Sequence, residues 1–411
     1  MKKKIINDPV YGFLNLKSEL IYRLVEHPYF QRLRRIGQLG LTSFVYPGAL
    51  HTRFHHALGA MHLMSIALDT LRKKGHFIFD EEYEAALIAI LLHDIGHGPF
   101  SHALESTILR GVHHEKLSLM LMEELNQQFD GRLGLAIRIF KGEHHRHFLH
   151  QLVSSQLDMD RLDYLQRDCF FTGVKEGSIG ADRLIQMLDL HEDRIVLEEK
   201  AIYSVENFLT ARRLMYWQVY LHKTTVSTEQ MLIQLIKRAK YLVASGVELM
   251  ATPSFNVFLK EDVSIEKFLL EKNYYLKHFA LLDDHDIWGS MKFWQHQDDK
   301  ILKELSRMIL NRETFKVDLS NEPFEKSESQ TIIEQIIKKF QVSEEEVTYL
   351  FTEGSISNSA YLDNEEKILI KTKKGEIVDI TKASDLPSIE ALSKSVTKFY
   401  RCYPKSLKKL Y

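Results

Sequence analysis

Hydrophobic positions repeat every three or four residues through most of the first 240 residues. The spacing of Leu20, Leu24, Leu33 and Ile36 is an example. This is the period of an amphipathic helix, whose apolar side chains face one side. We therefore expect a mostly helical segment from Lys17 to about Lys240. The clearest predicted helices lie within residues 17–36, 61–71, 117–125, 151–166 and 205–220.

Beyond about residue 245 the pattern changes to the alternation that is typical of strands. Residues 368–372 and 376–380 alternate on either side of Lys373-Lys374-Gly375, which predicts a β-hairpin. Residues 315–319 and 398–402 are further predicted strands, and residues 194–197 are one extended segment inside the helical part. The fold class is therefore predicted to be mainly α. We expect a helical bundle at residues 1–245 and a smaller α+β accessory or regulatory region at residues 246–411.

The composition supports long helices and a protein outside the membrane. There are only 19 glycines and 8 prolines among 411 residues, which argues against an all-β, collagen-like or disordered chain. The longest purely aliphatic run, Ala85 to Leu92, is far shorter than the roughly 20 residues that span a bilayer. The lysines at positions 2–4 resemble the start of a signal peptide, but Asn7-Asp8-Pro9 stands where an apolar stretch is needed. We expect a cytoplasmic protein with no membrane partner.

Charge and cysteine content narrow the chemistry further. Fifty-four basic residues oppose 56 acidic ones, so no globally basic surface is available and a nucleic-acid partner is not expected. Cys169 and Cys402 are the only cysteines, which excludes a disulfide framework and a cysteine-based zinc site. Most of the 20 histidines lie in the first 150 residues. Because histidine binds metals and transfers protons near neutral pH, we expect the functional site there.

Residues 91–102 read Leu-Leu-His-Asp-Ile-Gly-His-Gly-Pro-Phe-Ser-His, an apolar helix that ends in a His-Asp pair. Adjacent helical side chains point about 100° apart, but at a helix end both can face one ion, and Gly96 and Gly98 supply the turn away. Further ligands must come from elsewhere, and the candidates are the histidines of residues 53–59 and the carboxylates of residues 158–164. Two imidazoles and two carboxylates can hold a divalent ion and leave places for water and a phosphate oxygen.

Over residues 4–225 the chain resembles the HD-domain metal-dependent phosphohydrolases, and within them the dGTPase-like and SAM-and-HD-domain-type deoxynucleoside triphosphate triphosphohydrolases. The shared motifs, in chain order, are Asn7-Asp8-Pro9, Phe30-Gln31-Arg32-Leu33-Arg34, Gln38-Leu39-Gly40, Tyr46-Pro47-Gly48-Ala49, Arg53 to Gly59, His93 to His102, and Asp160 to Asp168. A lone His-Asp pair is weak evidence, whereas this ordered set is specific. The resemblance implies an HD-type helical bundle that hydrolyses deoxynucleoside triphosphates to deoxynucleoside and inorganic triphosphate.

The resemblance also implies one divalent metal ion, with Mn, Fe, Mg, Ni and Zn all as candidates, and a second Mg that arrives with the nucleotide. The implied metal ligands are His56, His93, Asp94 and Asp160. His114 matches the family's catalytic histidine, and Glu105 matches its acidic partner. Cleavage between the 5′-oxygen and the α-phosphorus needs a proton for the leaving alkoxide, and a carboxylate-supported imidazolium can donate it.

Further matches concern the substrate. The resemblance places four residues near the phosphates: Arg53, His97, His102 and Arg161. It places five more around the sugar, the phosphates and the base: Gln38, Tyr164, Asp168, Arg212 and Tyr220.

Assembly and regulation form a separate expectation. Family members commonly work as oligomers, so we expect a homo-oligomer, a dimer or a tetramer. In the regulated branch, nucleotides bind at subunit contacts, and the matching positions here are Lys4, Asn7, Glu26, Gln31 and Arg34. The alternative is that Lys4, Glu26 and Arg34 pair across a dimer surface, and the run Arg32, Arg34 and Arg35 is equally compatible with a solvated face.

Several alternatives stay open at this point. Another HD phosphohydrolase, such as a nucleoside monophosphatase, would use the same ligands, and a non-catalytic nucleotide sensor is the third possibility. His144, His145 and His147 resemble a metal-binding tract, but a loop or a solvated helix end is favoured there. Asp158 and Asp163 flank a predicted ligand, and we expect them to support it or to lie on the helix surface.

Overall fold

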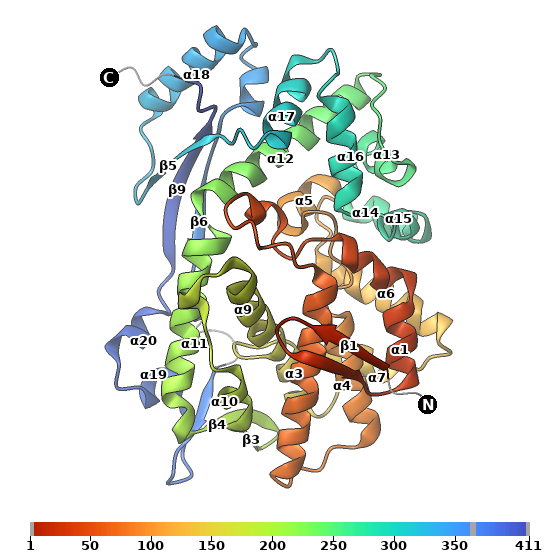
Figure 1. The fold of residues 1–411 in the computed structure, drawn as a ribbon, viewed down its shortest axis with the longest axis vertical. Coiled ribbons are helices and arrows are strands. Elements are labelled where there is room, and N and C mark those ends of the chain that lie inside the picture. Colours follow the sequence, from red (N-terminus) through yellow and green to blue (C-terminus); the bar gives the residue numbers. More distant parts are fainter. Residues whose placement is uncertain (1–3, 362–366, 408–411) are drawn as a thin grey trace.

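Helices dominate residues 4–361 and 367–407, the part of the chain that the computed structural model describes (Figure 1). The helices of the first 245 residues are α1 Glu19–Glu26, α2 Pro28–Gln31, α3 Arg53–Lys73, α4 Asp80–Leu92, α5 Ser101–Ile108, α6 His114–Gln128, α7 Gly134–Phe140, α8 His147–Val153, α9 Met159–Thr172, α10 Ala181–Gln186, α11 Ile202–Met215 and α12 Lys223–Ala244. Those that follow are α13 Pro253–Lys260, α14 Ile265–Leu270, α15 Lys272–Phe279, α16 Asp284–Trp294, α17 Lys300–Leu310, α18 Lys326–Phe340, α19 Ile380–Ala383 and α20 Pro387–Ala391. The mainly α prediction is confirmed.

Three small sheets accompany the helices. An antiparallel hairpin joins β1 Lys4–Asp8 to β2 Gly12–Leu16. A three-stranded antiparallel sheet contains β5 Lys316–Ser320, β9 Val396–Tyr403 and β6 Thr352–Asn358, in that order. A four-stranded sheet contains β3 Leu188–His191, β4 Arg194–Glu198, β7 Leu369–Lys371 and β8 Ile377–Asp379. The strands predicted at 194–197, 315–319, 368–380 and 398–402 are confirmed.

The four-stranded sheet links the two parts of the chain. β4 pairs in parallel with β7 through Leu197 and Ile370, so the predicted accessory hairpin completes a sheet that begins in the first 245 residues. Figure 1 shows this sheet at the lower end of the molecule, whereas helices α13 to α17 cover the upper right. Helix α12 ends at Ala244, next to the division predicted at residue 245, which stays a prediction.

Helix α3 lies against both α4 and α9 at the centre of the first half. The aliphatic run of α4 is buried on all sides, because the residues from Ala85 to Leu92 are at most 6% exposed. The contact of α3 with α9 depends on Gly59, since a Cβ there would lie 2.0 Å from Asp163 Oδ1 and 2.2 Å from Arg167 Nη2. Two motifs that are distant in sequence are thereby brought into direct contact.

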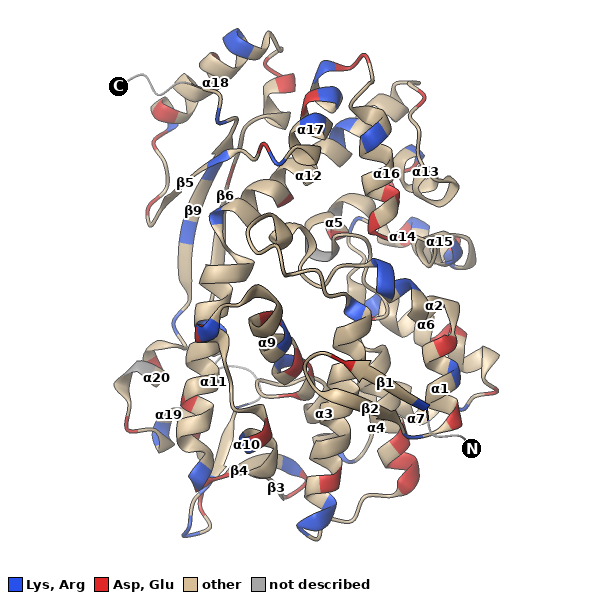
Figure 2. Ribbon diagram, viewed as in Figure 1, with Lys and Arg blue, Asp and Glu red and all other residues tan. Residues whose placement is uncertain are grey.

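Charged residues of both signs are interspersed along the helices, as expected from the near-neutral net charge (Figure 2). Within the described residues, no helix combines the length and the apolar character that crossing a membrane needs. Arg32 departs from the solvated face considered for the arginine run. Its guanidinium is buried and donates to the carbonyls of Leu282 and Ile95, at 3.0 and 2.7 Å.

Candidate metal and nucleotide site

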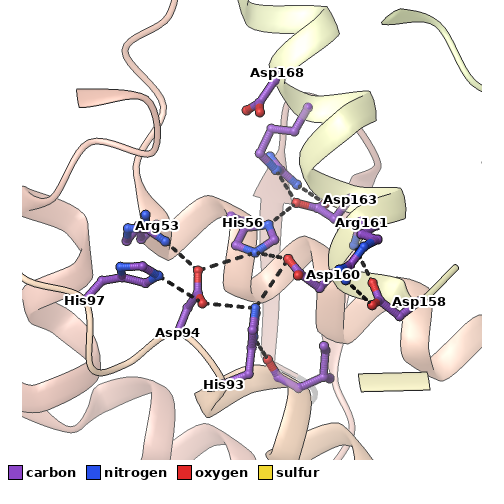
Figure 3. A network of polar contacts seen from close by, with 12 residues as sticks. Arg53, His56, His93, Asp94, His97, Asp158, Asp160, Arg161, Asp163 and Asp168 are labelled. Atoms are coloured by element: carbon purple, nitrogen blue, oxygen red, sulfur yellow. Dashed lines mark hydrogen bonds and ion pairs between the residues drawn. The ribbon is translucent and has the colours of Figure 1, made fainter. Parts of the chain in front are cut away.

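Three helices bring the predicted metal ligands together (Figure 3). His56 comes from the first turn of α3, His93 from the end of α4 and Asp160 from the start of α9. Asp160 Oδ1 lies 3.1 Å from His56 Nε2 and 3.4 Å from His93 Nε2. Asp94 closes the group from the other side, with its Oδ1 3.3 Å from His93 Nε2 and its Oδ2 3.8 Å from His56 Nε2.

Both imidazoles are oriented so that Nε2 faces this group. His56 Nδ1 lies 2.8 Å from Asp163 Oδ2, and His93 Nδ1 lies 2.6 Å from the carbonyl of Ile90. Since each acceptor takes the Nδ1 proton, the Nε2 atoms of both rings are directed inward. Among the described residues, neither Nε2 atom has a hydrogen-bond partner although both are buried. Two inward nitrogens beside carboxylate oxygens fit a divalent metal ion.

The pKa shifts within this group of residues also favour a bound cation. Burial by itself lowers the pKa of His56, but the carboxylates of Asp160 and Asp163 raise it to about 10. Burial likewise raises the pKa of Asp160, whereas His56 and His93 bring it below its usual range. The cluster therefore stabilises a positive charge at its centre, which is the requirement for a cation site.

Asp163 supports the cluster through His56, which is one of the two roles that the sequence analysis expected for it. It also binds Arg167, with Nε at 3.0 Å, and Arg167 Nη1 reaches Asp8 at 2.8 Å. This buried chain of charges explains why Asn7-Asp8-Pro9 and Asp160 to Asp168 occur together. Asp158 instead caps α9 by accepting from the backbone N–H of Arg161 at 2.7 Å.

A second histidine and carboxylate group lies beside the first. His114 begins α6, and its Nδ1 lies 3.3 Å from Glu105 Oε1, which also accepts the His114 backbone N–H at 2.7 Å. The His114 ring stacks on His97, with 3.9 Å between ring centroids. Burial and then Arg53 hold the pKa of His97 well below its ordinary value, so this ring is neutral. His113, next to His114, is 81% exposed in its side chain.

A cavity of about 470 Å³ connects these groups. Its lining includes the ionised side chains of Arg53, Asp94, Asp160 and Arg161 and the imidazoles of His97 and His114. The rest of the lining includes Gln38, Leu39, Phe100, Tyr164, Asp168, Tyr216, Tyr220 and Glu229. Asp168 is held on both oxygens, by the hydroxyl of Tyr220 and by His51 Nε2, each at 2.7 Å. Seven of the nine predicted substrate residues therefore face one space.

The other two substrate residues differ. The side chain of His102 lies outside the described part of the structure. Arg212 is not among the described residues of the lining, and its Nη1 binds Gln156 Oε1 at 3.2 Å.

The five predicted regulatory positions lie away from the cavity, around β1, α1 and α2. Lys4 Nζ donates to the Tyr22 hydroxyl at 3.2 Å, Gln31 donates to the carbonyl of Val25 at 2.8 Å, and Arg34 lies over the ring of Phe54. Asn7 belongs to β1 and Glu26 ends α1. Their regulatory role stays a prediction.

His144 and His145 of the histidine tract lie in the loop between α7 and α8, and His147 begins α8, which agrees with the loop or helix end favoured from the sequence. His144 Nε2 is 3.0 Å from Glu82 Oε1, and with His145 these atoms are close enough to hold a cation. However, the guanidinium of Arg146 is 3.2 Å from the other Glu82 oxygen and already balances that charge.

Sequence reasoning missed Glu229 and Tyr216, which also line the cavity. Burial raises the pKa of Glu229 to about 7. No motif marked this residue, and the signal that could have found it is one acidic position in the otherwise uncharged first half of a predicted helix, Thr224 to Leu235.

Comparisons with known proteins agree with this geometry. A family model described as HD domain matches residues 53–168, and one described as HD associated region matches residues 179–252. The chain is 53% identical to a phosphohydrolase of Bacteroides thetaiotaomicron in a crystal structure, with a TM-score of 0.95 over 98% of this chain and 100% of that one.

Two further relatives are more distant. The uncharacterized protein YwfO of Bacillus subtilis is 31% identical over 99% of this chain and 93% of its own length. The Dictyostelium discoideum homolog of the deoxynucleoside triphosphate triphosphohydrolase SAMHD1 is 32% identical, over 56% of this chain and 48% of its own. Because the HD match spans His56, His93, Asp94 and Asp160, and the likeness to a phosphohydrolase extends over the whole fold, the chain belongs to the HD-domain phosphohydrolases.

Proposed function

We propose that the protein hydrolyses deoxynucleoside triphosphates to deoxynucleoside and inorganic triphosphate. One observation carries this proposal: a single cavity of about 470 Å³ extends from the predicted metal ligands and the His114 group to a lining of tyrosines and the amide of Gln38. That volume falls within the range of small-molecule sites, roughly 300–1,000 Å³. The likeness to a relative named as a deoxynucleoside triphosphate triphosphohydrolase supports the same substrate.

The metal ligands in this proposal are His56, His93, Asp94 and Asp160. When bound, the divalent ion polarises a phosphate oxygen and a water molecule. Asp163 and the Ile90 carbonyl keep both imidazoles in the tautomer that leaves Nε2 free for the ion. The mixed imidazole and carboxylate set suits Mn, Fe, Mg, Ni and Zn alike.

His114 acts as general acid. Glu105 holds its Nδ1, so that Nε2 carries the proton that the 5′-oxygen of the leaving deoxynucleoside needs. His97, kept neutral, stacks on His114 and fixes the ring plane. His97 Nε2 is also 3.3 Å from Asp94 Oδ1, which ties the acid to the metal side of the cavity.

The phosphates bind to cationic side chains at the same end. Arg53 pairs with Asp94 at 2.5 Å and Arg161 pairs with Asp158 at 2.5 Å, so both guanidiniums are fixed before substrate enters. A guanidinium held in a fixed orientation suits phosphate oxygens, because its planar N–H groups match their geometry. Tyr164, Tyr220 and Gln38 then surround the sugar and the base.

The test is a product assay with metal-loaded protein. Each of the four deoxynucleoside triphosphates is incubated with the protein, and triphosphate, pyrophosphate and phosphate are separated. Release of triphosphate together with deoxynucleoside supports the proposal. Release of pyrophosphate or phosphate alone contradicts it, and turnover of deoxynucleoside monophosphates only would identify a monophosphatase instead.

Oligomer formation is part of the proposal. Phe13 and Ile5 of the β1–β2 hairpin are 72% and 55% exposed, which supports a contact at this end of the molecule, close to the regulatory positions. We expect a light-scattering mass of at least two chains. A monomer at assay concentration would contradict the oligomer, and stimulation by GTP that Arg34→Ala removes would assign these positions to nucleotide binding.

A further inference from the structure

The start of α16, far along the chain from the motifs, contacts two loops of the site. Asp284 Oδ2 accepts the backbone N–H of Gly37 at 2.8 Å, and Asp284 Oδ1 accepts the backbone N–H of Phe100 at 2.9 Å. Gly37 directly precedes Gln38. Phe100 ends the loop that follows His93-Asp94 and includes His97. One carboxylate therefore joins two loops that both line the cavity.

The Phe100 end of this link needs support. Phe100 has a left-handed backbone, with φ of +50°, which residues with a side chain rarely adopt. It is also the N-cap of α5, the helix that carries Glu105. Its buried ring packs on Trp288 of α16, with 5.7 Å between ring centroids. Backbone and side chain of Phe100 are thus both held by the same helix.

The two residues before Asp284 strengthen the link. The Leu282 carbonyl accepts from Arg32 Nη1 at 3.0 Å, while Arg32 Nη2 donates to the Ile95 carbonyl at 2.7 Å. Asp283 Oδ2 pairs with Arg35 Nε at 2.5 Å. Residues 282–284 therefore bind both the segment before Gln38 and the segment after Asp94, and hold the two segments together.

We propose that Asp284 is a positioning residue for the reaction, which sets Gln38 on one loop and His97 with the Glu105–His114 pair on the other at their working separation. This role rests on the proposed function for its catalytic consequence. Both partners of Asp284 are N–H donors, so two acceptor oxygens are required. Asparagine offers only one, because its amide nitrogen would face an N–H group.

The catalytic effect should differ from loss of the metal. His56, His93 and Asp160 are held by helix packing and by Asp163, and none of them contacts Asp284. A displacement of about 1 Å in a reacting geometry can reduce the rate by about 10²-fold. We therefore expect Asp284→Asn to lower kcat by about 10- to 100-fold with an unchanged metal content.

Asp286→Asn is the matched control. Asp286 lies two residues further along the same helix start, where it accepts the Asp283 N–H at 2.7 Å and the Thr252 hydroxyl at 2.5 Å. It touches neither loop. Its replacement should lower the thermal midpoint while kcat stays within about twofold. An equal loss of kcat in both variants would reduce Asp284 to a stability role and overturn the proposal.

Two further measurements keep the outcome decisive. Asp284→Glu keeps both carboxylate oxygens and should recover most of the kcat that Asp284→Asn loses; no recovery counts against positioning. Hydrogen exchange of the Gly37 and Phe100 amides needs no substrate. Faster exchange at these amides in Asp284→Asn supports the link even if the unaltered protein turns over no deoxynucleoside triphosphate, whereas unchanged protection overturns it.

Discussion

The predicted metal ligands, called the cluster below, and the His114 group lie side by side, but different parts of the fold hold them in place. The cluster takes His56 and Asp160 from the facing helices α3 and α9, and Gly59 permits their close approach. The His114 group depends on the loop from Ile95 to Phe100, which is fixed from outside by Asp284. The first arrangement uses only residues within the sequence motifs. The second also needs Asp284, about 190 positions further along the chain.

The two arrangements suit two different functions, cation binding and proton delivery. Binding a cation requires several ligands at fixed distances, which packed helices supply. In the proposed mechanism, delivering a proton requires the His114 ring to be held at one angle beside the substrate, and that angle would depend on a loop conformation. Variants of the cluster should therefore remove metal and activity together, whereas variants of the loop should reduce activity alone.

The largest effect is expected for Asp160→Ala. Asp160 Oδ1 lies within 3.4 Å of both imidazole nitrogens, so its loss removes the central anionic ligand. Metal content should fall from about one ion per chain to near zero, and turnover should fall by more than about 10²-fold, since even supporting residues of metal sites are worth 10–100-fold. Elemental analysis and circular dichroism check the metal and the helical content.

His145→Ala is the control for that experiment, because His145 belongs to the separate Glu82–His144 group. Its metal content should match that of the unaltered protein. Full metal occupancy in Asp160→Ala would show that the ligand assignment is wrong.

The next effect concerns proton delivery. His114→Ala should lower kcat by about 10²–10⁴-fold, the usual contribution of a general acid, without loss of metal. Steady-state kinetics and elemental analysis on the same sample separate the two duties. His113→Ala is the neighbouring control, and with its exposed ring it should change kcat little. Near-normal turnover in His114→Ala would remove this residue from the mechanism.

The sequence placed His56, His93 and Asp160 in short, ordered motifs, and the structure brings these motifs together. Their assignment as metal ligands came from the family resemblance and stays a prediction. The sequence also predicted the hairpin around Gly375 from strict alternation. It could not predict Asp284, since the value of that carboxylate comes from two backbone N–H groups supplied by distant loops. The burial of Arg32 could not be predicted for a related reason: its partners are two backbone carbonyls from distant segments, which no sequence pattern marks.

Short exposed strands were also missed. β1 and β2 carry outward Ile5 and Phe13 beside polar neighbours, so their pattern did not separate them from a loop. Glu229 was missed because a single carboxyl in a helix has no motif, and only the tertiary structure shows that it faces the cavity.

A smaller effect is expected at Glu229, which should change the binding of substrate and neither the metal content nor proton delivery. With a pKa of about 7, its carboxyl is neutral below that pH and negative above it. A triphosphate in the same cavity is repelled by the charged form, so KM should rise by about 3- to 10-fold between pH 6 and pH 8. Glu229→Gln should flatten this rise and leave metal content unchanged. An identical pH dependence of KM in both proteins would contradict it.

The smallest effect is expected at Asp189, which joins the two parts of the chain away from the site. Its carboxylate lies 2.6 Å from His76 Nε2 and 2.9 Å from Nζ of Lys371 on β7. Burial would raise the pKa of Asp189, but His76 and Lys371 lower it to about 2. Because this is below the unfolded value near 3.9, the carboxylate stabilises the fold above pH 4, and the contribution disappears as the pH falls from about 4 to 2. Asp189→Asn should lower the free energy of unfolding by about 1–2 kcal/mol at pH 7 and by much less at pH 3, as measured by urea unfolding.

Asp182→Asn is the control, because it replaces an exposed carboxylate on α10, and it should change neither value by more than about 0.5 kcal/mol. Turnover should stay unchanged in both, because this second link between the two parts touches no loop of the site. A loss of kcat in Asp189→Asn that matched the loss in Asp284→Asn would mean that general stability, and not the specific grip on the loop, keeps His114 in place.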